Sequence, residues 1–197
     1  MATGAGPTGL VGHFVAMARN NAWANHRLLT ACEALTPEEF AAPRTSFFPS
    51  LRLTFNHIYD VDLYYLAALE GGDAIGRIKA PDSDFADARS MRLAQTATDK
   101  RLIAFCERQT DASLQQDWHL PRLNRKPPPS KVGAILEHVF QHDIHHRGQA
   151  HAMLAGTRVK PPQLDEFFLA GEEALRRDEL IALGLPPDAQ STQLGSS

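Results

Sequence analysis

The chain has 197 residues and a formal net charge of −3, with 43% hydrophobic and 22% charged residues. This size and composition suit one soluble domain that buries its own core. The charges are interspersed and no window approaches the ~20 apolar residues of a membrane span, so neither a nucleic-acid nor a membrane partner is expected. Residues 1–10 lack the features of a signal peptide, and Cys32 and Cys106 stand alone in apolar patterns, which predicts buried reduced thiols in a cytoplasmic protein.

Apolar residues recur at helical spacing from the N-terminus onward. The first long helix is predicted over residues 9–35. A short helix follows, with Thr36 as its N-cap, Pro37 in its first position and Glu39 completing a capping box. A second long helix is predicted over residues 50–69, ending at a pair of glycines.

A third long helix is predicted over residues 84–108 after a polar loop, with Leu93 among its core candidates. The next connector contains Pro121 and the run Pro127-Pro128-Pro129, which exclude a helix there. We expect a short hairpin near residues 118–123 in this connector.

Ser130 is expected to cap the fourth long helix, which stops at Gly156. A terminal helical stretch is predicted over residues 165–183, and the polar tail 186–197 is expected to be disordered. Four long helices with one long connector between the third and fourth predict an all-α, four-helix up-down bundle with a C-terminal helical extension. Residues 1–185 would form this single domain, and such bundles build metal sites from side chains on facing helices.

The fourth helix carries an unusual density of histidines, because five of the nine fall between His138 and His151. His138, His142 and His146 are spaced i, i+4, so neighbouring imidazoles share one helical face and can converge on an ion. At about 100° per residue, His146 lies at the edge of the apolar face, His142 farther round and His138 farther still. His142 and His146 are therefore the better ligands. His138 is expected to lie behind them or in solvent, and His145 to be exposed.

A histidine pair alone is as consistent with a structural role as with metal binding. The pair also lacks the glutamate of H-E-x-x-H, so the zinc-protease pattern is excluded. His57 is the best third ligand, because it lies inside the second long helix and borders the apolar face of that helix. The residues therefore favour a site made by His57, His142 and His146.

Asp143 and Arg147 are expected to project toward the apolar face, where lone charges are costly. Their i, i+4 spacing lets them pair with each other, or with Asp62 of the second helix. A structural ion pair explains them at least as well as catalysis does. Asp60 or Asp62 is expected to orient a metal-bound imidazole. The candidates for a catalytic role are Asp62, Asp143, Arg147 and His138.

These residues resemble those of the DinB-like (damage-inducible) family, part of the DinB/YfiT-like metalloenzyme superfamily. The resemblance covers residues 14–168 and is carried by four segments in order: ARNNAWANHRLL (18–29), NHIYDVDLYYL (56–66), HVFQHDIHHRGQ (138–149) and PPQLDE (161–166). It implies a four-helix bundle, usually dimeric, with one divalent metal ion per chain on His57, His142 and His146. Zinc or nickel is the expected ion, with iron or manganese as alternatives. The adjacent pair His145-His146 departs from the commonest pattern and leaves His142 with His145 as an alternative pairing.

The same resemblance suggests a reaction, because some relatives are transferases or isomerases that use thiols such as bacillithiol or mycothiol. Three neutral histidines also leave a coordination position open, as in catalytic zinc sites. The leading hypothesis is a homodimeric S-transferase that uses a low-molecular-weight thiol and a small-molecule substrate. The alternatives are a metal-dependent hydrolase and a non-catalytic metal-binding stress-response protein.

Overall fold

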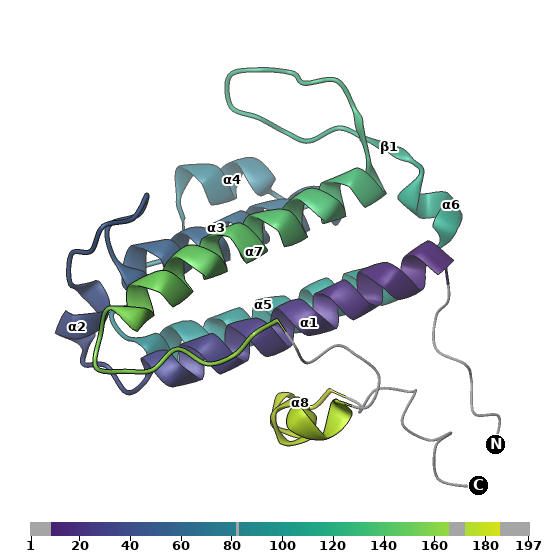
Figure 1. The fold of residues 1–197 in the computed structure, drawn as a ribbon. Coiled ribbons are helices and arrows are strands. Elements are labelled where there is room, and N and C mark those ends of the chain that lie inside the picture. The colour runs from purple at the N-terminus through teal and green to yellow at the C-terminus, as the bar shows by residue number, and fades with distance from the viewer. Residues whose placement is uncertain (1–8, 82, 166–171, 186–197) are drawn as a thin grey trace, which may run out of the picture.

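The computed structural model describes residues 9–81, 83–165 and 172–185 (Figure 1). The predictions made for residues 166–171 and for the tail 186–197 lie outside these ranges. The elements in chain order are α1 (Gly9–Cys32), α2 (Pro37–Ala41), α3 (Leu51–Leu69), α4 (Ala74–Lys79), α5 (Ala88–Glu107), α6 (Asp111–Leu114), β1 (Asp117–Trp118), β2 (Ser130–Lys131), α7 (Val132–Ala155), the 3-10 turn η1 (Glu173–Leu175) and α8 (Arg177–Leu183).

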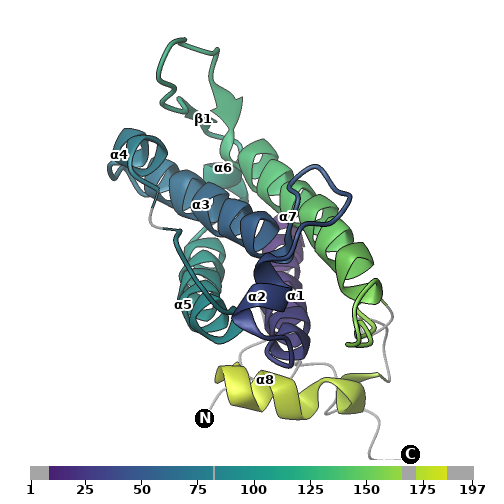
Figure 2. The ribbon, with the colours of Figure 1, turned by 90° about the vertical axis from the view of Figure 1, so that its left-hand side faces the viewer.

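The four long helices α1, α3, α5 and α7 lie side by side along the length of the molecule, and α8 lies across α1 outside them (Figures 1 and 2). Side-chain contacts give their directions: α1 runs antiparallel to α5 and parallel to α7, whereas α3 runs parallel to α5 and antiparallel to α7. The predicted all-α fold is confirmed. The expected up-down order is not observed, because the consecutive long helices α3 and α5 run parallel. Residues 70–87, which include α4, therefore return along the bundle.

The predicted caps are largely those observed. The backbone N–H of Glu39 donates to the Thr36 hydroxyl (3.2 Å), and that of Thr36 donates to the Glu39 carboxylate (2.8 Å), which confirms the capping box. Ser50 caps α3 by accepting from the N–H of Leu53 (3.1 Å). The third long helix begins later than predicted, because Asp87 caps the backbone N–H of Ser90 (2.8 Å).

The connector before α7 differs from its prediction. Ser130 is not the helix cap: it pairs with Trp118 in a two-stranded antiparallel ladder, and α7 therefore starts only after Lys131, which makes no side-chain cap. The strands lie at residues 117–118 and 130–131 rather than at 118–123. The Trp118 indole donates to the carbonyl of Ala68 at the end of α3 (2.9 Å), which holds the first strand against the bundle.

Two short helices, α4 and α6, were not predicted. Each begins at a cap: the Asp73 carboxylate accepts from the N–H of Gly76, and Thr110 forms a capping box with Ser113. Leu93 was wrongly assigned to the core, since it is 58% exposed. It lies two residues from fully buried Met91 and therefore on the other side of α5.

Two apolar clusters lie inside the bundle, one toward each end of the long helices, and a third joins α1 to α8. Buried polar side chains occupy the layer between the two clusters inside the bundle and come from all four long helices: Asn21, Asn25, Asp62, Gln95, Asp99, Asp143 and Arg147. Such a layer is stable only where its groups are hydrogen-bonded to one another, because an unpaired buried polar group is costly. The candidate metal centre lies at the edge of this polar layer.

Cys32 and Cys106 are buried as free thiols, as predicted. Burial raises the pKa of each thiol to about 12. Neither cysteine is therefore ionised at neutral pH, which removes both as nucleophiles. Across the described ranges, the helices lack the combination of length and apolarity that a membrane crossing requires.

Candidate metal centre

Three imidazoles converge between α3 and α7. His57 comes from α3, His142 and His146 come from α7, and one nitrogen of each lies within 4.8 Å of the others. The Nε2 atoms of His57 and His142 are 2.9 Å apart. Bonds of 2.0–2.1 Å to a tetrahedral zinc ion place ligand nitrogens roughly 3.3 Å apart. The histidines predicted from the sequence therefore come together in an arrangement that fits an ion after small side-chain movements.

Hydrogen bonds on the outer nitrogens set the direction of two of these rings. Nδ1 of His146 donates to Oε1 of Gln149 (2.8 Å), and Nδ1 of His142 lies 3.3 Å from Oδ1 of Asp143. An imidazole protonated on Nδ1 carries its lone pair on Nε2, and Nε2 of His142 is turned toward His57. The side chains behind His142 and His146 thus hold both rings in the form that binds a metal.

The expected orienting residues, Asp60 and Asp62, do not fill this role. Asp60 accepts from the hydroxyl of Ser83, and Asp62 accepts from the Gln95 amide (2.7 Å). Asp143 takes the position instead, because it follows His142 directly and its side chain turns back against that ring.

Two histidines of the cluster, His57 and His146, favour the neutral state. Burial, followed by the charges of His142 and His146, lowers the pKa of His57 to about 4. Burial also lowers the pKa of His146. Neutral imidazole is the form that ligates metal, so these rings need not lose a proton at neutral pH to bind an ion.

Aromatic side chains border the cluster on both sides. The ring of Phe48, from the loop before α3, lies 4.3 Å from that of His57 and 5.5 Å from that of His146. On the other side His138 is exposed, with its ring 6.3 Å from that of His142 and 5.3 Å from that of Tyr65. The sequence analysis missed Phe48, because nothing in the residue pattern places the loop of residues 42–50 over α7.

His145 is exposed, as predicted, and accepts a hydrogen bond from the Gln149 amide (3.1 Å). It does not belong to the group of converging nitrogens, so the arrangement supports His146 rather than His145 as the partner of His142.

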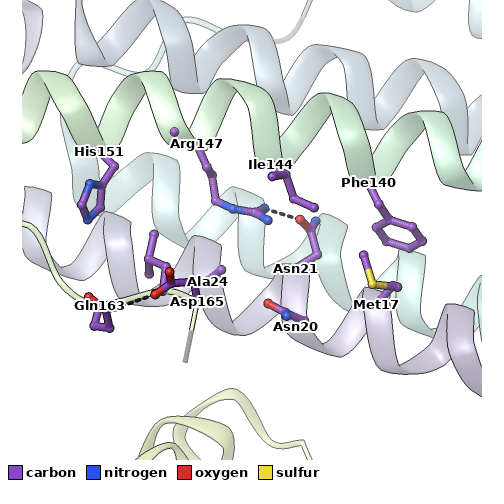
Figure 3. A pocket seen from close by; sticks show the side chains of 12 residues that line it. Met17, Asn20, Asn21, Ala24, Phe140, Ile144, Arg147, His151, Gln163 and Asp165 are labelled. Atoms are coloured by element: carbon purple, nitrogen blue, oxygen red, sulfur yellow. Dashed lines mark hydrogen bonds between the residues drawn. The ribbon is translucent and has the colours of Figure 1, made fainter. Parts of the chain in front are cut away.

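Asp143 and Arg147 are both buried, but they do not bond to each other directly. The Asn21 amide donates to Oδ2 of Asp143 (2.8 Å), while Arg147 donates to the Asn21 carbonyl oxygen and to that of Asn25 (3.0 Å). Figure 3 shows Arg147 reaching from α7 to Asn21 on α1. Asn21 therefore lies between the two charges, and their direct pairing, one of the two expected arrangements, is not the one observed.

Asp62 and Asp99 complete the polar layer on the other side. The Gln95 amide donates to both carboxylates, at 2.7 and 3.1 Å. Burial raises the pKa of Asp99 to about 7. Burial, followed by the charges of Asp143 and Asp99, raises the pKa of Asp62 well above its usual value.

Sequence reasoning overlooked Asn21, Asn25, Gln95 and Asp99 as parts of this layer. Their signal was available, since each pair has i, i+4 spacing within the apolar face of a long helix. Of the four candidates for catalysis, Asp62, Asp143 and Arg147 lie inside this layer, and His138 lies on the exposed side of the metal centre.

A hollow of about 500 Å³ lies between α1 and α7, with Met17 and Phe140 at one end and Arg147 near its middle (Figure 3). At 100° per residue, Phe140 and Arg147 lie on the side of α7 opposite to His142 and His146. The hollow therefore reaches the polar layer but not the histidines.

Comparison with known proteins agrees with this picture. The chain is similar to "Protein DinB" of Bacillus subtilis (strain 168), with 24% identity over 144 residues that cover 68% of this chain and 80% of that protein. The model of the DinB family matches residues 7–178, which include all three histidines and the four long helices. The chain belongs to the DinB family.

Proposed function

We propose that this protein is a metal-dependent S-transferase that binds one divalent ion, zinc or nickel, on His57, His142 and His146. The observation that carries the proposal is the convergence of three imidazoles at the edge of the bundle. Three protein ligands leave a coordination position free for a substrate, which is the arrangement of catalytic rather than structural sites. The substrates would be a low-molecular-weight thiol and a small electrophile.

A divalent ion in this site would lower the pKa of a bound thiol, so that the thiolate is present at neutral pH. The thiolate sulfur would then attack an electrophilic carbon and form a C–S bond. The leaving group would depart with its bonding electron pair, and the thiol proton would pass to solvent. The chain itself orients the ligands through Asp143 and Gln149, and Phe48 shields His57 and His146 from water.

The surroundings of the site favour a thiol over a water nucleophile. A metal-dependent hydrolase needs a base that can reach the bound water. Asp143, the carboxylate that lies against His142, is fully buried and bonded to His142 and Asn21, and Asp62 is buried with a raised pKa. A thiol needs no such base once it has ionised.

The second candidate function is a hydrolase with His138 as its base. His138 is exposed to solvent as a residue, but its imidazole is partly buried. This burial, followed by the charges of His142 and Arg122, lowers the pKa of His138 below its usual value, so the ring is mainly neutral at pH 7. His138→Gln separates the two reactions. It should abolish the hydrolysis of esters or lactones if His138 is the base, and leave thiol transfer within about threefold if the S-transferase proposal holds.

The first experiment is elemental analysis of protein purified without a histidine tag or added metal. We expect about one ion per chain in the wild type. His57→Ala should lose it, whereas His145→Ala, which removes an exposed histidine from the same helix, should keep it. The loaded protein is then assayed for conjugation of common biological thiols with an activated aryl halide. The proposal would be overturned if the wild type contains no divalent ion and takes up none when zinc or nickel is added. It would also be overturned if the metal-loaded protein binds no thiol.

A further inference from the structure

Arg122 occupies a fixed position in the connector between β1 and β2. Its guanidinium lies over the rings of Tyr64 and Tyr65, with Cζ 5.0 and 5.7 Å from the ring centres, and donates to the Tyr65 hydroxyl (3.1 Å). The Tyr64 hydroxyl donates to the carbonyl of Pro121 (2.7 Å), which fastens the preceding residue to α3. A guanidinium held in this way loses little side-chain entropy when it binds a ligand.

Arg122 differs from other arginines of the protein in its partners. Other arginines of the protein lie against carboxylates, as in the pairs Arg27–Glu179 (2.9 Å) and Arg158–Glu39 (2.9 Å). Arg122 makes no ion pair within the part of the chain that the structure describes. Its stacking on tyrosine rings leaves several N–H donors available, and these match the two oxygens of a carboxylate.

The surroundings of Arg122 are cationic. A hollow of about 620 Å³ is formed by the connector and α4, and its polar side chains are those of His119, Arg122, Arg125 and Lys126. The described residues that line it include neither aspartate nor glutamate. Three unbalanced cations around a hollow of this size favour an anionic occupant.

Tyr65, which Arg122 covers, is linked to the histidine centre through the ring of His138. Tyr65 follows His57 by eight residues, or about 12 Å along the helix axis. On α7, His138 precedes His142 by four residues, or about 6 Å. The rings of Tyr65 and His138 are 5.3 Å apart, and those of His138 and His142 are 6.3 Å apart, so side chains connect the two places continuously.

We propose that Arg122, assisted by Arg125 and Lys126, binds a carboxylate of the molecule whose reacting group occupies the histidine centre. The inference rests on the proposed function and narrows its substrate class. The thiol or its electrophilic partner is an acidic molecule with a carboxylate roughly 12 Å from the reacting atom, the separation of His57 and Tyr65 along α3.

Two series of probes test the inference on cobalt-loaded full-length protein: ω-mercaptoalkanoic acids of increasing length and the matched neutral ω-mercaptoalkanols. Thiolate-to-cobalt absorbance reports binding of the head group. At the matching length the acid should bind about tenfold tighter than the alcohol, as expected for one charge-assisted interaction. Arg122→Gln should remove this preference without changing the affinity for the alcohol. The control Arg89→Gln, an exposed arginine of α5 outside the hollow, should keep it.

The thiol of each probe tests the S-transferase proposal, and its terminal carboxylate or alcohol tests the anion site. Binding of both series with equal affinity, or a preference that survives Arg122→Gln, overturns the inference and leaves the S-transferase proposal standing. Failure of every thiol to bind overturns the S-transferase proposal. In that case alkyl hydroxamates with and without a terminal carboxylate replace the thiols as metal-binding heads. Tighter binding of the hydroxamate with the carboxylate, lost in Arg122→Gln, then supports the anion site. Equal binding of the two hydroxamates overturns the anion site as well.

Discussion

The position of Asp143 behind His142 leads to a quantitative prediction for metal affinity. Its Oδ1 lies 3.3 Å from Nδ1 of His142, and its Oδ2 accepts from the Asn21 amide (2.8 Å). Asp143→Asn keeps the size of the side chain and removes its negative charge. An amide that still accepts from His142 with its oxygen must place its NH₂ group toward the Asn21 amide, where two donors face each other.

The expected loss follows from what outer hydrogen bonds contribute at metal sites. Removing the partner of a ligating imidazole costs about 10–100-fold in metal affinity. That is about 1.4–2.7 kcal/mol, to which the loss of a buried charge near the ion adds in the same direction. Competition with a chromophoric chelator measures the affinity directly. Glu137→Gln, which removes an exposed carboxylate from the same helix, is the matched control and should stay within about twofold of the wild type.

Two outcomes would contradict this reasoning. An affinity of Asp143→Asn within twofold of the wild type would mean that Asp143 does not support His142. A large loss accompanied by a lower unfolding midpoint in excess chelator would point to collapse of the polar layer instead, so both quantities are measured on the same samples.

Three further changes test the fold around the site. Burial raises the pKa of Asp99 to about 7, above an unfolded value near 3.9, so the folded state binds more protons between these values. The contribution of Asp99 to the free energy of unfolding is therefore fully present below about pH 4 and is lost by about pH 7, at up to about 1.4 kcal/mol per pH unit. Asp99→Asn should flatten this dependence of stability on pH, measured by urea unfolding of protein kept metal-free with a chelator. Equal pH dependence in the variant and the wild type would refute the reasoning. Trp118→Phe removes the hydrogen bond to Ala68 and should cost about 1 kcal/mol by the same assay, whereas an unchanged midpoint would show that the bond contributes nothing. Leu136→Ala, at a fully buried core position, should cost about 2–5 kcal/mol, and a loss under 1 kcal/mol would mean that the core refills the space.

The long helices and the histidine cluster were predictable because both depend on local periodicity. Thr36 and Ser50 cap their helices as expected, and His142 and His146 lie on the face of α7 that meets α3. Helical spacing specifies which side chains share a face, and a four-helix bundle allows few arrangements of such faces.

The features that the sequence analysis missed depend on contacts between distant residues. Ser130 looked like a helix cap, but pairing with Trp118 twelve residues earlier placed it in a strand. Phe48 covers His57 because of the path of a whole loop, which no local pattern encodes. The partner of Arg147 could not be chosen from charge alone, since the neutral Asn21 intervenes between it and Asp143.

The order of residues on α7 lets one helix carry two candidate ligands, His142 and His146, together with the charged residues Asp143 and Arg147 of the polar layer. His142-Asp143 and His146-Arg147 are two dipeptides one turn apart, each a histidine followed by a charged residue. Since one residue turns the helix by about 100°, the histidines face α3 while Asp143 and Arg147 face the core and α1. Any movement of α7 against α1 would act on the Asn21 bonds and on the ring of His142 together. The polar layer that costs stability in the core thereby fixes the register of the helix that carries two of the three candidate ligands.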